Sequence, residues 1–124
     1  KKDQAKQAYV QAKDTVREID GISVMTLIVE DSDMESLREL ADRFRQEYKK
    51  GTAVFANIAE KDNAQLIATV SDALVKEGYH AGKIAKNVAS QIGGSGGGRP
   101  QLAQAGGKDT VKLKNVFENI EKYI

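Results

Sequence analysis

The feature that most constrains the fold is a nearly unbroken apolar stretch from Ile19 to Val29, rich in β-branched residues. β-Branched side chains favour strands, and a strand that lacks alternating polar residues is covered on both of its faces. We therefore predict a central strand here. The expected fold class is α/β: a small mixed or antiparallel sheet with packed helices, preceded by the end of a longer N-terminal helix.

Hydrophobic periodicity and local stop signals predict the elements around this strand. They are a helix over residues 1–17, a helix that Ser32 or Asp33 caps and Gly51 stops, strands over 52–59 and 65–70 that form an antiparallel hairpin, helical stretches over 72–77 and 80–92, and a last helix capped by Asp109 or Thr110. The first helix carries only a thin apolar stripe, so we expect it to pack against a part of a larger protein that this chain lacks.

Composition excludes several kinds of site. The chain has no Cys and one His, which rules out disulfides, thiolate zinc sites and multi-histidine metal sites. No apolar run approaches the roughly 20 residues that span a bilayer. We expect His80 to be a surface or helix-capping residue, and the acidic residues Glu30, Asp31 and Asp33 to serve helix capping, with metal binding as the alternative.

Glycine and positive charge gather in one part of the chain. Residues 1–75 contain 11 basic and 14 acidic side chains, whereas residues 76–124 contain 8 basic and 4 acidic ones. Of the 11 glycines, 9 lie between Gly78 and Gly107. A basic, glycine-rich segment suggests an anionic partner, although on charge alone a solvated basic face is the simpler explanation.

The densest glycine run, from Gly93 to Lys108, reads GGSGGGRPQLAQAGGK. It does not match the dinucleotide fingerprint, because the last glycine of that motif is missing when the count starts at Gly94 or Gly96. It does not match a P-loop either, because Gly98 is followed by Arg-Pro and Lys108 by Asp. A flexible linker is the plain alternative, but it does not explain the Arg-Pro pair or the periodic helices on both sides. We predict a loop whose glycines let the backbone approach a phosphodiester and form a nest for an anion.

Basic and amide side chains around this loop complete a candidate nucleic-acid-binding site, with Arg99 as its main contact to a phosphate or a guanine edge. The site residues are Gly93, Gly94, Ser95, Gly96, Gly97, Gly98, Arg99, Gln101, Gln104, Lys83, Lys86 and Lys108. No catalytic or metal-binding residue is assigned. Aromatic residues make up only 6% of the chain, which argues against an extensive base-stacking platform.

This segment resembles the glycine-rich signature near the C-terminus of bacterial alanyl-tRNA synthetases. The family pattern is a glycine run with Gly-Arg-Pro, an apolar residue, Ala-Gln and Gly-Gly, and it falls on Gly96–Pro100, Leu102–Gln104 and Gly106–Gly107. The order of the expected elements over residues 18–124 agrees with the same globular domain. Residues 1–17 then resemble the end of the helical linker subdomain that precedes it.

The resemblance implies a tRNA-binding domain that is not itself catalytic. In the family, such a domain holds the outer corner, or elbow, of the tRNA so that the aminoacylation and editing sites act on one tRNA. The implied parent is a cytoplasmic alanine–tRNA ligase that uses ATP with Mg²⁺ and has Zn²⁺ at its editing site, whereas no cofactor is expected in this chain. The implied partners are alanine tRNA, the rest of the synthetase and, as in some relatives, a second copy, but no membrane.

Two other functions stay open at this stage. The signature is shared more loosely with the domain appended to DHH-type phosphoesterases and exonucleases, which would bind single-stranded nucleic acid, although Arg99 stands where those proteins often have histidine. A dimerisation module is the other alternative, in which the apolar stripe of the last helix forms an interface. Packing in the core is the simpler explanation of that stripe, which comprises Leu113, Val116, Phe117, Ile120 and Ile124.

Overall fold

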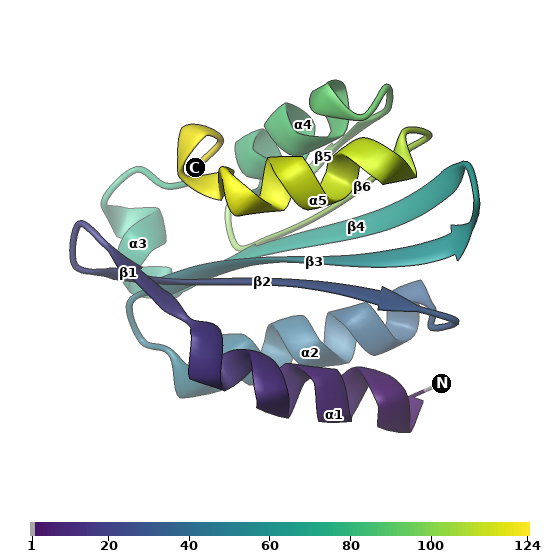
Figure 1. Ribbon diagram of the computed structural model, residues 1–124. Helices are drawn as coiled ribbons and strands as arrows, with labels where there is room; N and C mark the ends of the chain where they lie inside the picture. Colours follow the sequence, from purple (N-terminus) through teal and green to yellow (C-terminus); the bar gives the residue numbers. More distant parts are fainter. Residues whose placement is uncertain (1) are drawn as a thin grey trace.

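The computed structural model describes residues 2–124 and confirms the α/β class (Figure 1). In chain order the elements are α1 (Lys2–Ala12), a 3₁₀ turn (Lys13–Thr15), β1 (Arg17–Ile19), β2 (Ile22–Glu30), α2 (Met34–Glu47), β3 (Gly51–Glu60), β4 (Asn63–Val70), α3 (Asp72–Lys76), α4 (Ala81–Gln91), β5 (Ser95–Gly98), β6 (Leu102–Gly107), α5 (Thr110–Glu118) and a second 3₁₀ turn (Ile120–Lys122). None of the helices in this described part is long and apolar enough to cross a bilayer.

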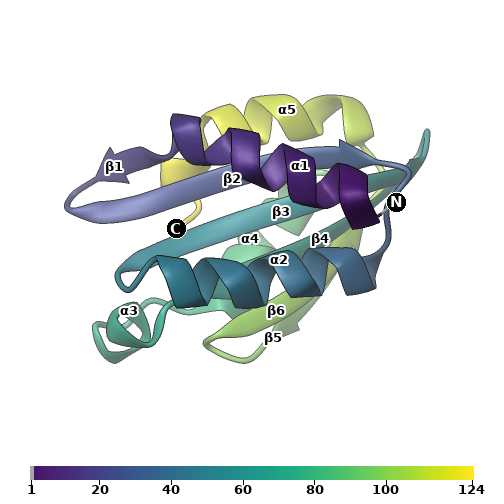
Figure 2. The same ribbon diagram turned by 90° about the horizontal axis from the view of Figure 1, so that it is seen from below.

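One mixed sheet of six strands lies between two layers of helices, in the order β1-β2-β3-β4-β6-β5. Only β2 and β3 run parallel, and every other neighbouring pair is antiparallel. Helices α1 and α2 cover one face and α4 and α5 the other (Figures 1 and 2). The apolar stripe of α5 is buried in the core of its own chain, with Leu113 and Ile120 fully enclosed, so it is not an exposed interface.

The long apolar stretch forms a hairpin rather than one strand. Asp20 and Gly21 turn the chain with positive φ angles of 55° and 80°, so that β1 pairs back onto the start of β2. Two central residues with positive φ match the type I′ turn that joins antiparallel strands, and Asp-Gly is a preferred sequence for it. The prediction that the first helix extends to residue 17 is therefore wrong, because the strand requires an extended Arg17.

Helix α1 packs on this chain's own sheet instead of on an absent part of a larger protein. Ala5, Tyr9 and Ala12 are buried in the core cluster that lies beneath α2. The Tyr9 hydroxyl donates to Oε1 of Glu47 at 2.6 Å, and Lys13 Nζ donates to Oε2 of the same carboxylate at 2.9 Å. Glu47 thus ties α1 to α2, while the domain boundary after residue 17 stays a prediction.

The predicted helix caps are largely confirmed. Asp33 accepts from the backbone N–H of Ser36 at 2.8 Å and Asp109 from that of Lys112 at 3.0 Å. His80 caps α4, its Nδ1 accepting from the Lys83 N–H at 3.3 Å. Gly51 does not stop α2, which ends at Glu47, but begins β3 beneath the ring of Phe44.

The predicted glycine loop is instead a β-hairpin, β5–β6, at the edge of the sheet. Helix α4 packs so close to it that a Cβ on Gly82 would lie 2.6 Å from the carbonyl oxygen of Gly98. A Cβ on Gly96 would lie 2.2 Å from that of Ala105, whereas one on Gly97 would meet nothing within 4 Å. The loop prediction fails because glycine has a low β-propensity and gives no apolar alternation.

Substitutions on the two faces of β5 should differ in their effect on stability. Gly96→Ala forces a methyl group into a filled space and should lower the free energy of unfolding by about 1–3 kcal/mol. Gly97→Ala points into open space and should change it by no more than about 0.5 kcal/mol. Urea unfolding of the two variants beside the unaltered chain provides the measurement, and equal stabilities would contradict the described register.

The hydrogen bonds of Tyr9, Lys13 and Arg43 to the Glu47 carboxylate should make the stability of the fold depend on pH. Its hydrogen bond from Tyr9, followed by those from Lys13 and Arg43, holds the pKa of the Glu47 carboxyl below its usual value. A lowered pKa in the folded chain means that the stabilisation is present at neutral pH and is lost as the pH falls through that lowered pKa. Glu47→Gln should therefore destabilise the chain at pH 7, and the difference should shrink towards pH 3.

Urea unfolding at both pH values measures this effect, with Glu60→Gln, an exposed carboxyl at the end of β3, as the control. Tyr9→Phe removes only the hydroxyl and should cost about 1 kcal/mol at pH 7. A Glu47→Gln penalty that is the same at the two pH values would rule out the charged form as the source of the stabilisation.

Candidate nucleic-acid interface

Strand β5 forms one outer edge of the sheet and pairs only with β6. All four of its residues, Ser95–Gly98, are exposed. In an extended strand successive N–H groups point in opposite directions, so they do not converge on one anion as the predicted nest requires. The edge instead offers a row of backbone donors and acceptors on which glycine leaves no side chain in the way.

The turn at the end of this hairpin is fixed to two other elements. The carbonyl oxygen of Pro100 accepts from the backbone N–H of Ala81, at the start of α4, at 2.8 Å. The carbonyl oxygen of Gln101 accepts from the backbone N–H of Val70, at the end of β4, at 3.0 Å. Arg99 is therefore an exposed side chain on an anchored backbone, which lowers the entropy lost when it binds a ligand.

A groove of about 450 Å³ lies beside this turn. Its hairpin residues are Gly97, Gly98, Arg99, Leu102, Ala103 and Gln104, and α2 contributes Arg38. Both arginines are exposed, and neither has an ion pair among the side chains that the structure describes, from residue 4 onward. Two guanidinium groups with free donors next to a bare backbone edge form a surface suited to phosphate.

Sequence reasoning missed Arg38. Arg38 and Arg45 are seven residues apart, so they lie on one side of α2. Arg45 donates to the Thr69 hydroxyl at 2.8 Å and pairs with Asp42, which places this side of the helix next to the hairpin turn. The i, i+7 arginine pair was the available signal, but only the fold shows that it faces the glycine-rich segment.

The structure brings together only part of the predicted site. Arg99, Gln104, Gly97 and Gly98 line the groove, and Ser95, Gly96 and Gln101 are exposed on the same hairpin. Lys83 and Lys86 are exposed on α4, which covers the opposite face of the sheet. Lys108 follows β6 at the end of the hairpin away from Arg99.

Two of the predicted glycines have a structural use. Gly93 ends α4 with a φ of 69°, a left-handed conformation that glycine adopts without strain. A Cβ on Gly94 would collide with the carbonyl oxygen of Gly106.

Lys83 lines a separate pocket with His80 and Tyr79 rather than the groove. Among the described residues there is no cluster of three or more His, Cys, Asp or Glu side chains that could hold a metal ion.

The comparisons with known proteins agree with one another. The family model of the DHHA1 domain matches residues 4–124. The chain is 48% identical to an alanine–tRNA ligase of Geobacillus thermodenitrificans over 110 residues, which are 88% of this chain and 12% of the ligase. It is 42% identical to the alanine–tRNA ligase of Exiguobacterium sibiricum over 124 residues, 98% of this chain and 14% of that ligase.

A solved structure supports the same assignment. The crystal structure of the C-Ala domain from Aquifex aeolicus alanyl-tRNA synthetase superimposes with a TM-score of 0.78 and 27% sequence identity, covering 87% of this chain and 96% of that domain. The chain thus spans a small part of the curated ligases and nearly the whole of the solved domain. It belongs to the DHHA1 domain family, in the form that bacterial alanine–tRNA ligases contain.

Proposed function

We propose that this domain binds the elbow of a tRNA as part of an alanine–tRNA ligase. The observation that carries the proposal is the position of Arg38 and Arg99 in one groove, beside an edge strand made of Ser95 and three glycines, with no ion pair to either arginine among the described side chains. The sequence similarity to alanine–tRNA ligases supports tRNA as the nucleic acid that binds here.

The chemistry of the surface suits folded RNA. Because three of the four residues of β5 are glycines, a ribose-phosphate backbone can reach the backbone N–H groups at its edge, and the arginines can each bind a phosphate through two N–H groups. Such contacts read the shape and charge of a folded RNA rather than its base sequence. The elbow presents that kind of target, which is common to all tRNAs.

In this proposal the domain positions the tRNA and carries out no step of the reaction itself. With the tRNA held at its outer corner, the acceptor end is presented both to the aminoacylation site, which uses ATP and Mg²⁺, and to the zinc-dependent editing site. Both sites belong to other parts of the proposed parent enzyme, which is cytoplasmic in this proposal. Residues 1–17 would be the end of the helical linker subdomain that joins those parts to the globular domain at 18–124.

Removal of either arginine from the groove should weaken tRNA binding without unfolding the chain. We expect Arg99→Ala and Arg38→Ala each to cost about 1–3 kcal/mol of binding free energy and to lower the salt dependence, since each removes a phosphate contact. Lys122→Ala, which removes an exposed charge from the second 3₁₀ turn, is the matched control. Titration curves that coincide for all three variants would refute the assignment of the groove.

The kind of nucleic acid can be tested with the same chain. A titration with alanine tRNA at two salt concentrations, with an unrelated tRNA and a single-stranded DNA as competitors, should show binding that salt weakens and that DNA competes poorly. Gly97→Ala should bind alanine tRNA more weakly than the unaltered chain does, because the new methyl group stands where the RNA backbone approaches. Preferential binding of single-stranded DNA would instead support the exonuclease-type function.

A further inference from the structure

Two aromatic rings of this chain are free to stack on a ligand. Of its four tyrosines and three phenylalanines, the ones enclosed in the core are Tyr9, Phe44, Phe55 and Phe117. The ring of Tyr48 stacks on that of Phe44, with 4.6 Å between the centroids and 17° between the planes. The two that remain, Tyr79 and Tyr123, are half-buried and stack on no other ring in the part of the chain that the structure describes.

Both of these tyrosines line one pocket of about 340 Å³, which we call the tyrosine pocket. Helix α4 and the segment before it contribute Glu77, Gly78, Tyr79, His80, Lys83, Ile84 and Asn87, and the end of the chain contributes Tyr123 and Ile124. Small-molecule sites have volumes of about 300–1000 Å³ and combine apolar or aromatic walls with a few polar groups. The tyrosine pocket therefore has the size and the lining of a site for a small aromatic ligand.

An amide in this pocket can read the edge of a nucleobase. Nδ2 of Asn87 donates to the carbonyl oxygen of Tyr123 at 3.5 Å, which uses one of its two N–H groups. The other N–H and the Oδ1 atom have no partner within the described chain. Such a donor–acceptor pair matches adenine, which presents the acceptor N7 beside the donor N6, whereas guanine presents two acceptors on the same edge.

The charged groups of the pocket suit a phosphate. Lys83 is exposed and has no ion pair among the described side chains. The acidic residue of the pocket, Glu77, pairs with Lys50 at 3.7 Å, which offsets its charge. Nδ1 of His80 accepts from the Lys83 N–H, so the neutral ring carries its proton on Nε2 and keeps a further donor.

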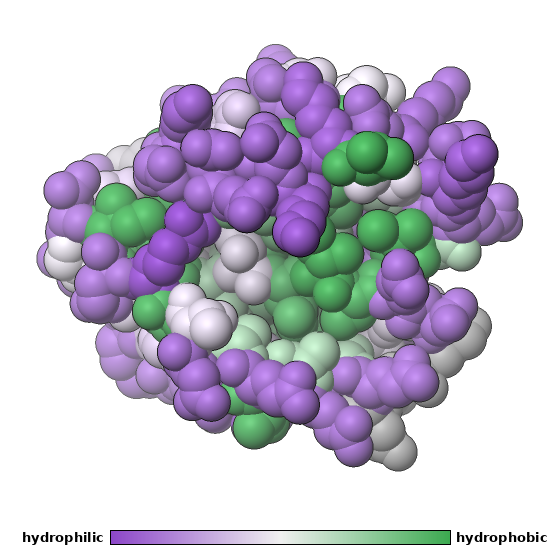
Figure 3. Space-filling model, in the orientation of Figure 1, coloured by the Kyte–Doolittle hydropathy of each residue, from purple (hydrophilic) through white to green (hydrophobic). Residues whose placement is uncertain are grey.

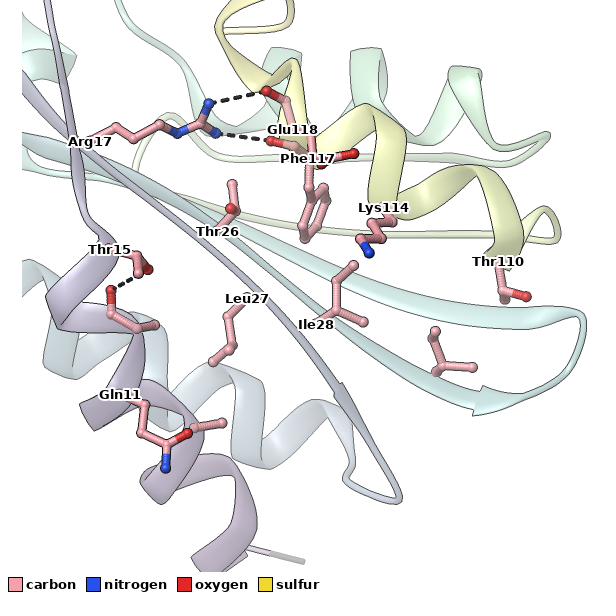
Figure 4. Close-up of a pocket in the computed structure, with 13 residues that line it drawn as sticks. Gln11, Thr15, Arg17, Thr26, Leu27, Ile28, Thr110, Lys114, Phe117 and Glu118 are labelled. Atoms are coloured by element: carbon pink, nitrogen blue, oxygen red, sulfur yellow. Dashed lines mark hydrogen bonds between the residues drawn. The ribbon is translucent and has the colours of Figure 1, made fainter.

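A larger groove of the molecule lacks these features. It has a volume of about 1000 Å³ and runs along the outer edge of β2, between α1 and α5 (Figure 4). Because β1 pairs only with Ile22–Val24, the strand predicted to be central forms an edge from Met25 onward in the described chain. In the space-filling view the groove is the apolar strip in the middle of the face (Figure 3). Phe117 is the only aromatic residue among the described ones that line it, and at 4% exposure its ring cannot stack on a ligand.

We propose that the tyrosine pocket binds an adenine nucleotide. The base stacks on the rings of Tyr79 and Tyr123, and its N6 amino group and N7 pair with the free amide groups of Asn87. The phosphate binds the ammonium group of Lys83. This inference does not rest on the proposed function, because none of these four residues lines the groove of Arg38 and Arg99.

The nucleotide has two possible sources, which are a free mononucleotide and an unpaired adenosine of an RNA. The pocket lies next to the turn that carries Arg99, because the N–H of Ala81, which follows His80, donates to the carbonyl oxygen of Pro100 at 2.8 Å. The arginine groove lies on the α2 side of this turn and the tyrosine pocket on its α4 side. An RNA bound in the groove is therefore close enough to offer a base to the pocket.

A titration of the 124-residue chain with AMP, followed by nuclear magnetic resonance, tests the proposal. The backbone amide signals of residues 77–87 and 123–124 should shift, and the base protons of AMP should move upfield as they enter the shielding cones of the tyrosine rings. We expect a dissociation constant on the order of 1 mM. GMP should bind at least about fivefold more weakly, because it offers two acceptors to the Asn87 amide.

Variants then assign the contacts. Tyr123→Ala should raise the dissociation constant for AMP at least about fivefold, whereas Tyr123→Phe keeps the ring and should bind as the unaltered chain does. Lys83→Ala should raise it about threefold, and Asn87→Ala should remove the preference for AMP over GMP. Lys76→Ala, an exposed change on α3 outside the pocket, is the control and should leave AMP binding unchanged.

The absence of signal shifts up to about 20 mM AMP, or AMP binding that Tyr123→Ala and Lys83→Ala leave unchanged, overturns the proposal. If circular dichroism shows that Tyr123→Ala does not fold, Lys83→Ala and Asn87→Ala decide. A titration of Tyr123→Ala with alanine tRNA distinguishes the two sources: weaker binding assigns the nucleotide to RNA, and unchanged binding assigns it to the free pool. The AMP titration contains no tRNA, so its outcome is independent of whether the arginine groove binds one.

Discussion

The close packing of α4 on the β5–β6 hairpin is the constraint on which this half of the molecule depends. A Cβ on Gly82 of α4 would meet the carbonyl oxygen of Gly98, and within the hairpin Cβ atoms on Gly96 and Gly98 would meet Ala105 and Ala103 of β6. The contact buries the apolar face of α4, including Ile84 and Val88, over a hairpin whose outer strand consists of Ser95 and three glycines. This glycine-rich hairpin is stable because α4 and β4 supply the apolar surface that it lacks.

The same constraint separates the glycines that packing requires from one that it does not. A Cβ on Gly96 or Gly98 would collide with the paired strand β6, at Ala105 and Ala103 respectively, whereas one on Gly97 would meet nothing within 4 Å. A side chain is excluded by packing at the first two positions but is sterically allowed at Gly97. Packing therefore does not explain the glycine at position 97, whereas the proposed approach of a ligand backbone would explain it.

Local signals in the sequence were sufficient for some elements and not for others. Asp33, His80 and Asp109 cap their helices through hydrogen bonds within three residues, so sequence spacing predicts them. The β3–β4 hairpin follows from two apolar runs around a polar turn. Strand β5 was missed because its stability comes from α4 and β6 rather than from its own residues. Arg38 was missed for a related reason, since its place in the groove depends on how α2 crosses the sheet.

The order of the strands gives the two ends of the sheet different chemistry. At one end the edge strand is Ser95 and three glycines beside Arg38 and Arg99, which suits the proposed approach of an anionic polymer. At the other end the β2 edge lies in a groove lined by Leu27, Ile28 and Phe117, where Lys114 and Glu118 carry opposite charges and have no ion pair among the described side chains. A polyanion gains little at this end, because the positive charge of Lys114 is offset by the neighbouring Glu118. The difference between the two ends therefore supports assigning the proposed nucleic-acid contact to the β5 end of the sheet.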